Sequence, residues 1–234
     1  MELSHSFQHK ASPERKVFAD IETTGLYHFQ GHRIVEIALI ETLNNKETGN
    51  VKHFIVNPEC PIPSRVVTIH GLTDEKVAAM PLFKDVAAEL RDFIGDSSVY
   101  ITCRTKNAGP IPEAEYKYGV KPGEIENEYT LDIDFTNSEF SNAGVPIVPR
   151  EQWINVRRWS EAMFGNGVMN CPEGTLEYIV ERYGIKVENR TAESGHSAPL
   201  DTQLLIAAFG PLEKEYKEFL SGQLPAKVYA PKPQ

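Results

Sequence analysis

Apolar residues gather in short runs along this chain, and polar turns separate them. Within one run Val35, Ile37 and Leu39 alternate with neighbours of other kinds, a period of two that is typical of a strand. Clusters of Asn, Gly and Pro bound these runs and predict turns, as at Asn44–Asn50. The predicted strands are Lys16–Ile21, Arg33–Leu43, Val51–Asn57, Ser98–Thr102 and Gln152–Val156.

Other segments repeat their apolar residues every three or four positions, which predicts amphipathic helices. Gly95 follows the first of them as a candidate C-cap, and Gly210-Pro211 is expected to break or bend the last. Strands first and then helices interleaved with strands indicate a mixed sheet covered by helices, an α/β fold. The predicted helices are residues 82–94, 131–143, 157–164, 175–183 and 200–220.

The length of 234 residues suits one domain with its own core. We expect a flexible leader at residues 1–14, a main domain at 15–212 with a long insert at about 102–129, and a helix end with a Pro-containing tail at 213–234. The insert is rich in Pro, Gly and Glu, which suits a mobile surface lid.

Composition narrows the setting in which the protein works. No apolar run reaches the length of a membrane helix, and the polar first residues lack the core of a signal peptide, so we expect a cytoplasmic protein without membrane contact. Three scattered cysteines indicate free thiols in a reducing compartment. The net charge of −9 argues against tight binding to long nucleic acid by the chain alone, although bound divalent cations would offset the charge of an acidic site.

A carboxylate pair stands at the end of the first predicted strand. Asp20 and Glu22 share one face of that strand and could together hold a cation, or they could be a solvated pair at a strand end. The apolar residues before them favour the metal site, because a carboxylate beside a core needs a partner. Gly25 then permits a tight turn.

A second pattern lies near the end of the sequence, where His196 precedes Asp201 by five positions. On a helix this spacing gives about 140° of rotation, so the two side chains would not share a helical face. We therefore expect His196 on a loop, Ser197 as an N-cap and Asp201 at the helix start. A surface histidine beside a first-turn aspartate is the alternative interpretation.

The two patterns together resemble the motifs of the DnaQ-like (DEDDh) 3′→5′ exonuclease family. The first matches its Asp-x-Glu-Thr-Thr-Gly motif and the second its His-x4-Asp motif, and the similarity spans about residues 15–210. Within the family the chain is most similar to the proofreading epsilon subunits of bacterial DNA polymerase III. Ribonuclease T and oligoribonuclease resemble it more distantly.

The middle motif departs from the family pattern. A His-Asn pair normally follows the fourth strand, but Cys103-Arg104 stands there, and the expected helix begins only after the insert. Two aspartates on that helix, Asp132 and Asp134, lie about 200° apart, so only one can face the site. We select Asp132, which lies between the buried Leu131 and Phe135, and expect Asp134 on the solvated side.

The resemblance implies a ribonuclease H-like, mixed five-stranded sheet with helices on both faces. It also implies two Mg²⁺ (or Mn²⁺) ions, held by Asp20, Glu22, Asp132 and Asp201, with His196 as the general base. An imidazole, whose ordinary pKa is about 6.5, suits that role. The residues implied to contact the terminal nucleotide are Thr23, Thr24, Gly25, Leu26 and His70.

The implied activity is removal of nucleoside 5′-monophosphates from single-stranded or frayed DNA 3′ ends, with a DNA polymerase as a candidate partner. Two alternatives remain open. The chain could trim RNA instead, because the motifs do not separate DNA from RNA. The altered middle motif could also mark an impaired protein that only binds nucleic acid or acts as a scaffold.

Overall fold

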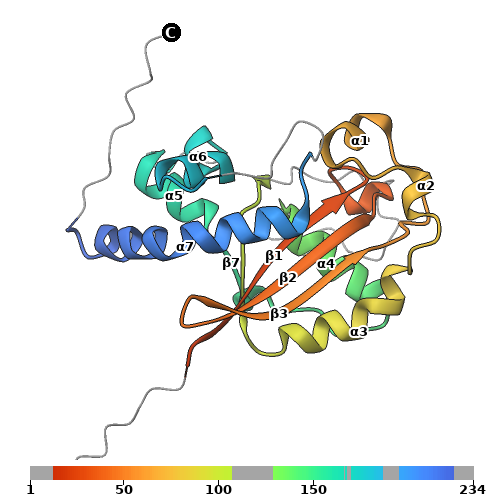
Figure 1. The fold of residues 1–234 in the computed structure, drawn as a ribbon, viewed down its shortest axis with the longest axis horizontal. Coiled ribbons are helices and arrows are strands. Elements are labelled where there is room, and N and C mark those ends of the chain that lie inside the picture. The colour runs from red at the N-terminus through yellow and green to blue at the C-terminus, as the bar shows by residue number, and fades with distance from the viewer. Residues whose placement is uncertain (1–12, 107–128, 166, 168–169, 187–194, 224–234) are drawn as a thin grey trace, which may run out of the picture.

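A five-stranded sheet forms the centre of the protein, with β1 (Arg15–Thr23) in its middle position (Figure 1). The computed structural model describes residues 13–106, 129–165, 167, 170–186 and 195–223. The strand order is β3-β2-β1-β4-β7, antiparallel from β3 to β1 and parallel from β1 to β7. This is the mixed sheet that the sequence predicted. Its remaining strands are β2 (Ile34–Leu43), β3 (Lys46–Ile55), β4 (Ser98–Ile101) and β7 (Trp153–Asn155).

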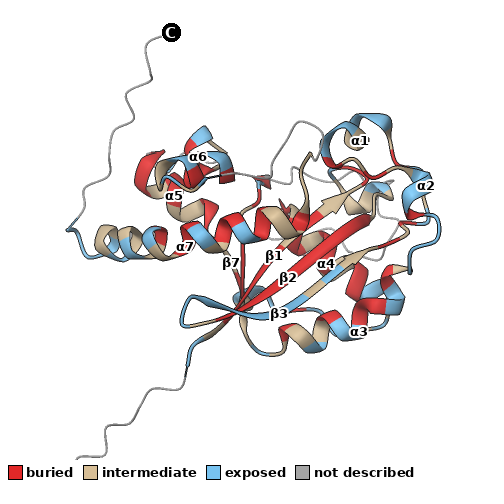
Figure 2. Cartoon of the chain, viewed as in Figure 1, coloured by how far each residue is buried: buried red, intermediate tan, exposed pale blue. Residues whose placement is uncertain are grey.

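The turn between β2 and β3 is shorter than predicted. Asn44 and Asn45 both adopt positive φ, 51° and 61°, and this two-residue turn suits the twist of the flanking strands. Consequently β3 begins at Lys46 rather than at Val51, and the polar stretch that was predicted as a turn forms an exposed edge strand. Figure 2 shows the contrast between this exposed strand and the buried β2 beside it.

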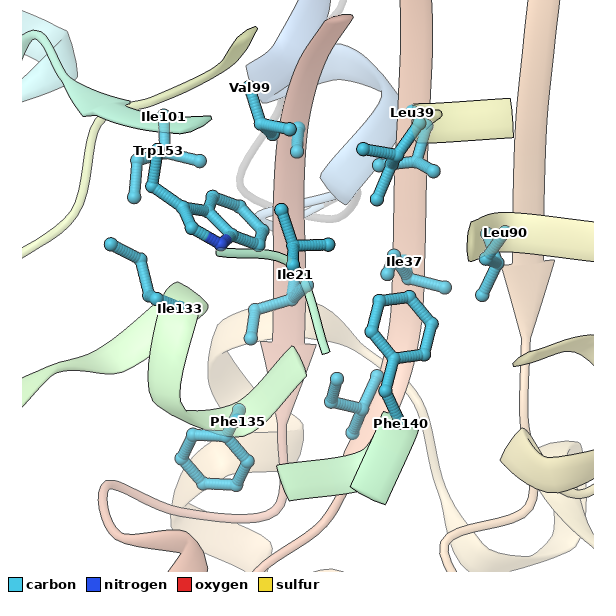
Figure 3. Close-up of a cluster of buried hydrophobic side chains, with 14 of the residues drawn as sticks. Ile21, Ile37, Leu39, Leu90, Val99, Ile101, Ile133, Phe135, Phe140 and Trp153 are labelled. Carbon is cyan, nitrogen blue, oxygen red and sulfur yellow. The ribbon is translucent and has the colours of Figure 1, made fainter. Parts of the chain in front are cut away.

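One face of the sheet packs against α3 (Phe83–Ile94) and α4 (Leu131–Asn142). Val17, Ala19 and Ile21 of β1 belong to this face and join the apolar residues of both helices. Figure 3 shows Ile21 in this cluster, together with Ile133 and Phe140 of α4. Leu90 and Phe140 fill this core without exposure to solvent. Gly95 closes α3, as predicted, and its N–H donates to the Arg91 carbonyl.

The opposite face of the sheet is covered by α5 (Arg157–Phe164), α6 (Leu176–Arg182) and α7 (Ala198–Leu220). Phe18 of β1 points to this side and packs edge-on against Phe209 of α7. Since Asp20 and Glu22 follow Phe18 with a period of two, they face α7 as well. The helices therefore lie on both faces, as expected.

Of the predicted break or bend at Gly210-Pro211, the break is wrong, because α7 runs through Pro211. Proline removes one helical hydrogen bond, to the carbonyl of Ala207. Both residues are exposed, so water can satisfy that carbonyl, while Leu212 immediately after is fully buried and holds the helix on its neighbours.

Several short elements were not predicted. Among them, β5 (Thr105–Lys106) pairs with β6 (Tyr129–Thr130) and closes the base of the insert. Most of the expected lid at about 102–129, most of the expected leader at 1–14 and the last part of the expected tail at 213–234 lie outside the described residues, namely 107–128, 1–12 and 224–234. The other short elements are η1 (His28–Gln30), α1 (Ser64–His70), α2 (Asp74–Val77), η3 (Arg150–Gln152) and η4 (Pro172–Gly174).

Within the described part of the chain, none of the helices combines the length and the apolar character that crossing a membrane requires.

Candidate active site

The end of β1 delivers Asp20 and Glu22 to one edge of the sheet. The register between β1 and β2 shifts just after Glu22, and this irregularity ends the regular pairing where the polar turn begins. The turn is held from inside: Thr24 is fully buried, and its Oγ1 accepts from the Arg33 N–H at 3.0 Å. A Cβ at Gly25 would lie 2.4 Å from the His32 ring, so any larger residue here would have to displace that side chain.

The start of α7 brings His196 and Asp201 to the same edge. His196 lies on the preceding loop and Asp201 in the first helical turn, as predicted. Gly195 adopts a φ of +61°, and a Cβ there would lie 2.3 Å from the Ile69 carbonyl oxygen, so only glycine fits. The His196 N–H donates to that same carbonyl at 2.7 Å, which ties the loop to α1.

A buried glutamate anchors the helix start from below. Glu36 of β2 is 5% exposed, and its Oε2 accepts from the Ala198 N–H at 2.9 Å. Its Oε1 lies 2.8 Å from Nε2 of His53. A carboxylate at a helix N-terminus meets free N–H groups and the positive end of the helix dipole, so Glu36 holds α7 against the sheet.

Three of the predicted groups converge closely. One ligand atom from each of Glu22, His196 and Asp201 lies within 4.8 Å of the other two. Nδ1 of His196 is 3.0 Å from Oδ2 of Asp201. Asp20 lies in the same cavity as this group. Burial first, and then the nearby charges of Asp132, Glu22 and Asp201, raise the pKa of Asp20 well above its ordinary value.

Asp132 reaches the site from the first turn of α4. It is 4% exposed, and burial raises its pKa to about 7, although a hydrogen bond with the Cys103 thiol opposes the shift. Its Oδ2 has no hydrogen-bond partner among the described residues. A buried carboxylate left in this state is costly unless a cation or a proton joins it.

Asp134 binds to the backbone at the start of α4 instead of facing the site. Its predicted solvated position is wrong. It is half-buried, its Oδ2 accepts from the Thr130 N–H at 2.5 Å, and burial raises its pKa to about 6. This bond satisfies a free N–H at the start of α4, where a carboxylate is favoured. Asp134 thus caps the helix that presents Asp132.

These carboxylates form a donor set suited to divalent cations. Several acidic groups converge, burial and the charges of Asp132, Glu22 and Asp201 raise the pKa of Asp20, and one buried oxygen of Asp132 lacks a partner among the described residues. Hard cations such as Mg²⁺ take oxygen ligands and neutralise such repulsion. The residues therefore fit the metal ions that the resemblance implied.

A cavity of about 490 Å³ opens beside the carboxylates and is lined by Asp20, Glu22 and Asp201. Of the residues predicted to contact nucleotide, Thr23, Gly25, Leu26 and His70 line it as well. The buried Thr24 is not among the lining residues, and its side chain supports the turn instead. His70 is 6% exposed, burial lowers its pKa, and its Nδ1 accepts from the Leu72 N–H at 3.1 Å.

Sequence reasoning overlooked three residues beside the cavity. Cys103 contacts Asp132, and Arg104 follows it along the cavity wall. Asn155, at the end of β7, donates to the Cys103 carbonyl at 2.9 Å. The departure from the His-Asn pattern was the only signal in the sequence for the first two. Nothing in the sequence marked Asn155.

Comparison with known proteins places the chain among exonucleases. The Exonuclease family of the RNase T type matches residues 17–108. DNA polymerase III subunit epsilon of Rickettsia felis is 45% identical over 198 residues, which cover 83% of this chain and 72% of the relative. The Salmonella typhimurium subunit is 30% identical over 199 residues, with 83% and 70% coverage. The match to the Haemophilus influenzae subunit, 37% identical, spans 37% of that relative's length.

Solved structures share the fold at low sequence identity. E. coli exonuclease I in complex with a dT13 oligonucleotide superposes with a TM-score of 0.62 at 15% identity and covers 89% of this chain and 43% of that one. The nuclease domain of 3′hExo, a DEDDh family member bound to rAMP, gives 0.56 at 15% identity, with 94% and 99% coverage. The predicted ribonuclease H-like architecture is confirmed at the level of the fold.

Proposed function

Because the chain belongs to the family of DNA polymerase III epsilon-type exonucleases, we propose that it removes nucleoside 5′-monophosphates from DNA 3′ ends with two divalent cations at the carboxylate cluster. The observation that carries the proposal is the convergence of Glu22, His196 and Asp201 beside Asp20 and the buried Asp132. Glu22 and Asp201 would hold one cation, Asp132 would hold the second, and Asp20 would serve both.

Bound cations would supply activation of the attacking water and stabilisation of the leaving 3′ oxygen. The protein's own part follows from His196. Because Nδ1 faces the Asp201 carboxylate at 3.0 Å, a neutral imidazole with its proton on Nδ1 leaves Nε2 able to accept one from water. Asp201 therefore fixes the tautomer of the base as well as binding metal.

Two exposed apolar side chains of the cavity wall would contact the base of the terminal nucleotide. Leu26 is 48% exposed and Ile69 is 46% exposed, although both are apolar and both line the cavity. Exposed apolar side chains at a cavity suit the face of a base. Thr23 donates through Oγ1 to the Gly25 carbonyl at 2.6 Å and so fixes the turn that carries Leu26.

The relatives are subunits of DNA polymerase III, so we infer that this chain too acts beside a replicative DNA polymerase, in the cytoplasm. RNA trimming is the alternative substrate class, and one experiment separates the two.

Matched oligomers of single-stranded DNA, duplex DNA with a mispaired 3′ end, and RNA are incubated with Mg²⁺, with Mn²⁺ or with EDTA, and the products are resolved by mass. We expect 5′-monophosphates from DNA with either metal and none with EDTA. Faster release from RNA would favour the alternative, and internal fragments would contradict exonuclease action.

A further inference from the structure

The cavity has an acidic lining, although its substrate is an anion. Four carboxylates line it, those of Asp20, Glu22, Glu177 and Asp201. Cations bound at the carboxylates would neutralise the negative lining where the scissile phosphate binds, but they would not contact the next phosphate. The next phosphate along the strand needs a positive group of the protein's own.

Two arginines line the cavity, and one of them is already engaged. Arg157 is 4% exposed, its Nε donates to Glu161 at 2.8 Å, and its terminal nitrogen donates to the Cys171 carbonyl at 3.0 Å. Arg104 is exposed, and within the described part of the chain no ion pair or hydrogen bond occupies its guanidinium.

The backbone on both sides of Arg104 is held in place. Asn155 Nδ2 donates to the Cys103 carbonyl at 2.9 Å and to Thr105 Oγ1 at 3.4 Å. Thr105 is 2% exposed, and its carbonyl accepts from Asn170 at 2.5 Å. A charged side chain on such a fixed base loses little backbone entropy when it binds a ligand.

From this placement we propose that Arg104 binds the 5′-phosphate of the penultimate nucleotide, one phosphate beyond the bond that is cut. Arg104 makes no ion pair with the carboxylates over which the scissile phosphate must lie. The guanidinium fork matches the oxygens of a phosphate, so the contact would be charge-assisted and bidentate. The inference rests on the proposed exonuclease function and adds a specificity residue to it.

Two thymidine dinucleotides test the contact. The first, dTpdT, has only the scissile phosphate, and the second carries one more, on the 5′ oxygen of the penultimate nucleotide. For the wild-type protein we expect kcat/KM to be about tenfold higher with the phosphorylated form, mainly through KM. Arg104→Ala should bring this ratio close to one and leave hydrolysis of dTpdT unchanged. Arg104→Lys should retain part of the preference.

Lys84→Ala is the control, since Lys84 is exposed on α3 and does not line the cavity, and it should keep the full ratio. An unchanged ratio in Arg104→Ala, or no preference in the wild type, overturns the proposal. So does an equal fall in kcat on both substrates, which would place Arg104 on the scissile phosphate. If the wild type cleaves neither dinucleotide, the exonuclease function fails. The ratio of their dissociation constants in Ca²⁺, measured by calorimetry, then still decides the Arg104 contact.

Discussion

The outer motifs, Asp20–Glu22 and His196–Asp201, contrast with the middle segment, which comprises residues 101–106 and 129–134. The outer motifs keep the family spacing, and glycine fixes each of them at a close approach, Gly25 beside His32 and Gly195 against α1. The middle segment lacks the His-Asn pair and carries a long insert, yet Asp132 still reaches Asp20. Asp132 is placed by the start of α4, so the number of residues between β4 and α4 does not determine whether its side chain reaches the site.

The largest effect should come from the carboxylate that serves both cations. Asp20→Asn should lower turnover by about 10⁴-fold or more, because both metal sites lose a ligand. Turnover is measured on single-stranded DNA, and circular dichroism serves as the control for folding. Wild-type turnover in this variant would show that the outer motifs do not hold the metal.

The middle segment is tested by its two aspartates. Asp132→Asn should lower turnover by about 10³-fold. Asp134→Asn should change turnover less than threefold and leave the free energy of unfolding nearly unchanged, because its amide oxygen can still accept from the Thr130 N–H. Steady-state kinetics and urea unfolding measure the two quantities. The reverse pattern would mean that α4 presents Asp134 to the site.

Within the outer motifs, His196→Ala tests whether the histidine acts as a general base or as a metal ligand. We expect turnover to fall by about 10²–10³-fold while the Mn²⁺ concentration for half-maximal rate stays the same, since a general base is lost and no metal ligand is. Turnover is measured across a Mn²⁺ titration. Because His196 lies within 4.8 Å of Glu22 and Asp201, a large rise in that concentration would instead identify it as a ligand.

The smallest effect concerns stability without metal. The pKa of Asp132 is about 7 in the folded protein, above its ordinary value of about 3.9, so the folded state keeps a proton that the unfolded state releases. As pH rises from about 4 to 7, this group therefore lowers the free energy of unfolding. Asp132→Asn should be more stable than the wild type by roughly 2 kcal/mol at pH 8 in EDTA, and by little at pH 4.

Urea unfolding at both pH values measures this difference, and saturating Mg²⁺ should reverse its sign at pH 8, because the wild type can bind both cations whereas the variant loses the one held by Asp132. Equal free energies of unfolding for the wild type and Asp132→Asn at pH 8 in EDTA would mean that ionising the buried Asp132 carboxyl costs no stability.

The same contrast explains what the sequence could predict. The strands and long helices followed from apolar periodicity, and the outer motifs from residue types at fixed spacing. The capping role of Asp134 and the buried support by Thr24 could not be predicted, because both depend on the directions of backbone N–H groups in the folded protein. The engagement of Arg157, which leaves Arg104 available, likewise depends on tertiary contacts with Glu161 and Cys171.

The hydrogen bond from Ala198 to Glu36 has a consequence for how the protein acquires its activity. It joins residues 162 positions apart, and closing so long a loop costs entropy that only later contacts offset. The sheet can form before α7 docks, but the outer motifs meet only when α7 reaches Glu36. A chain still emerging from the ribosome would therefore lack His196 and Asp201 at the site, so the complete set of site residues forms only after α7 has been synthesised and has docked.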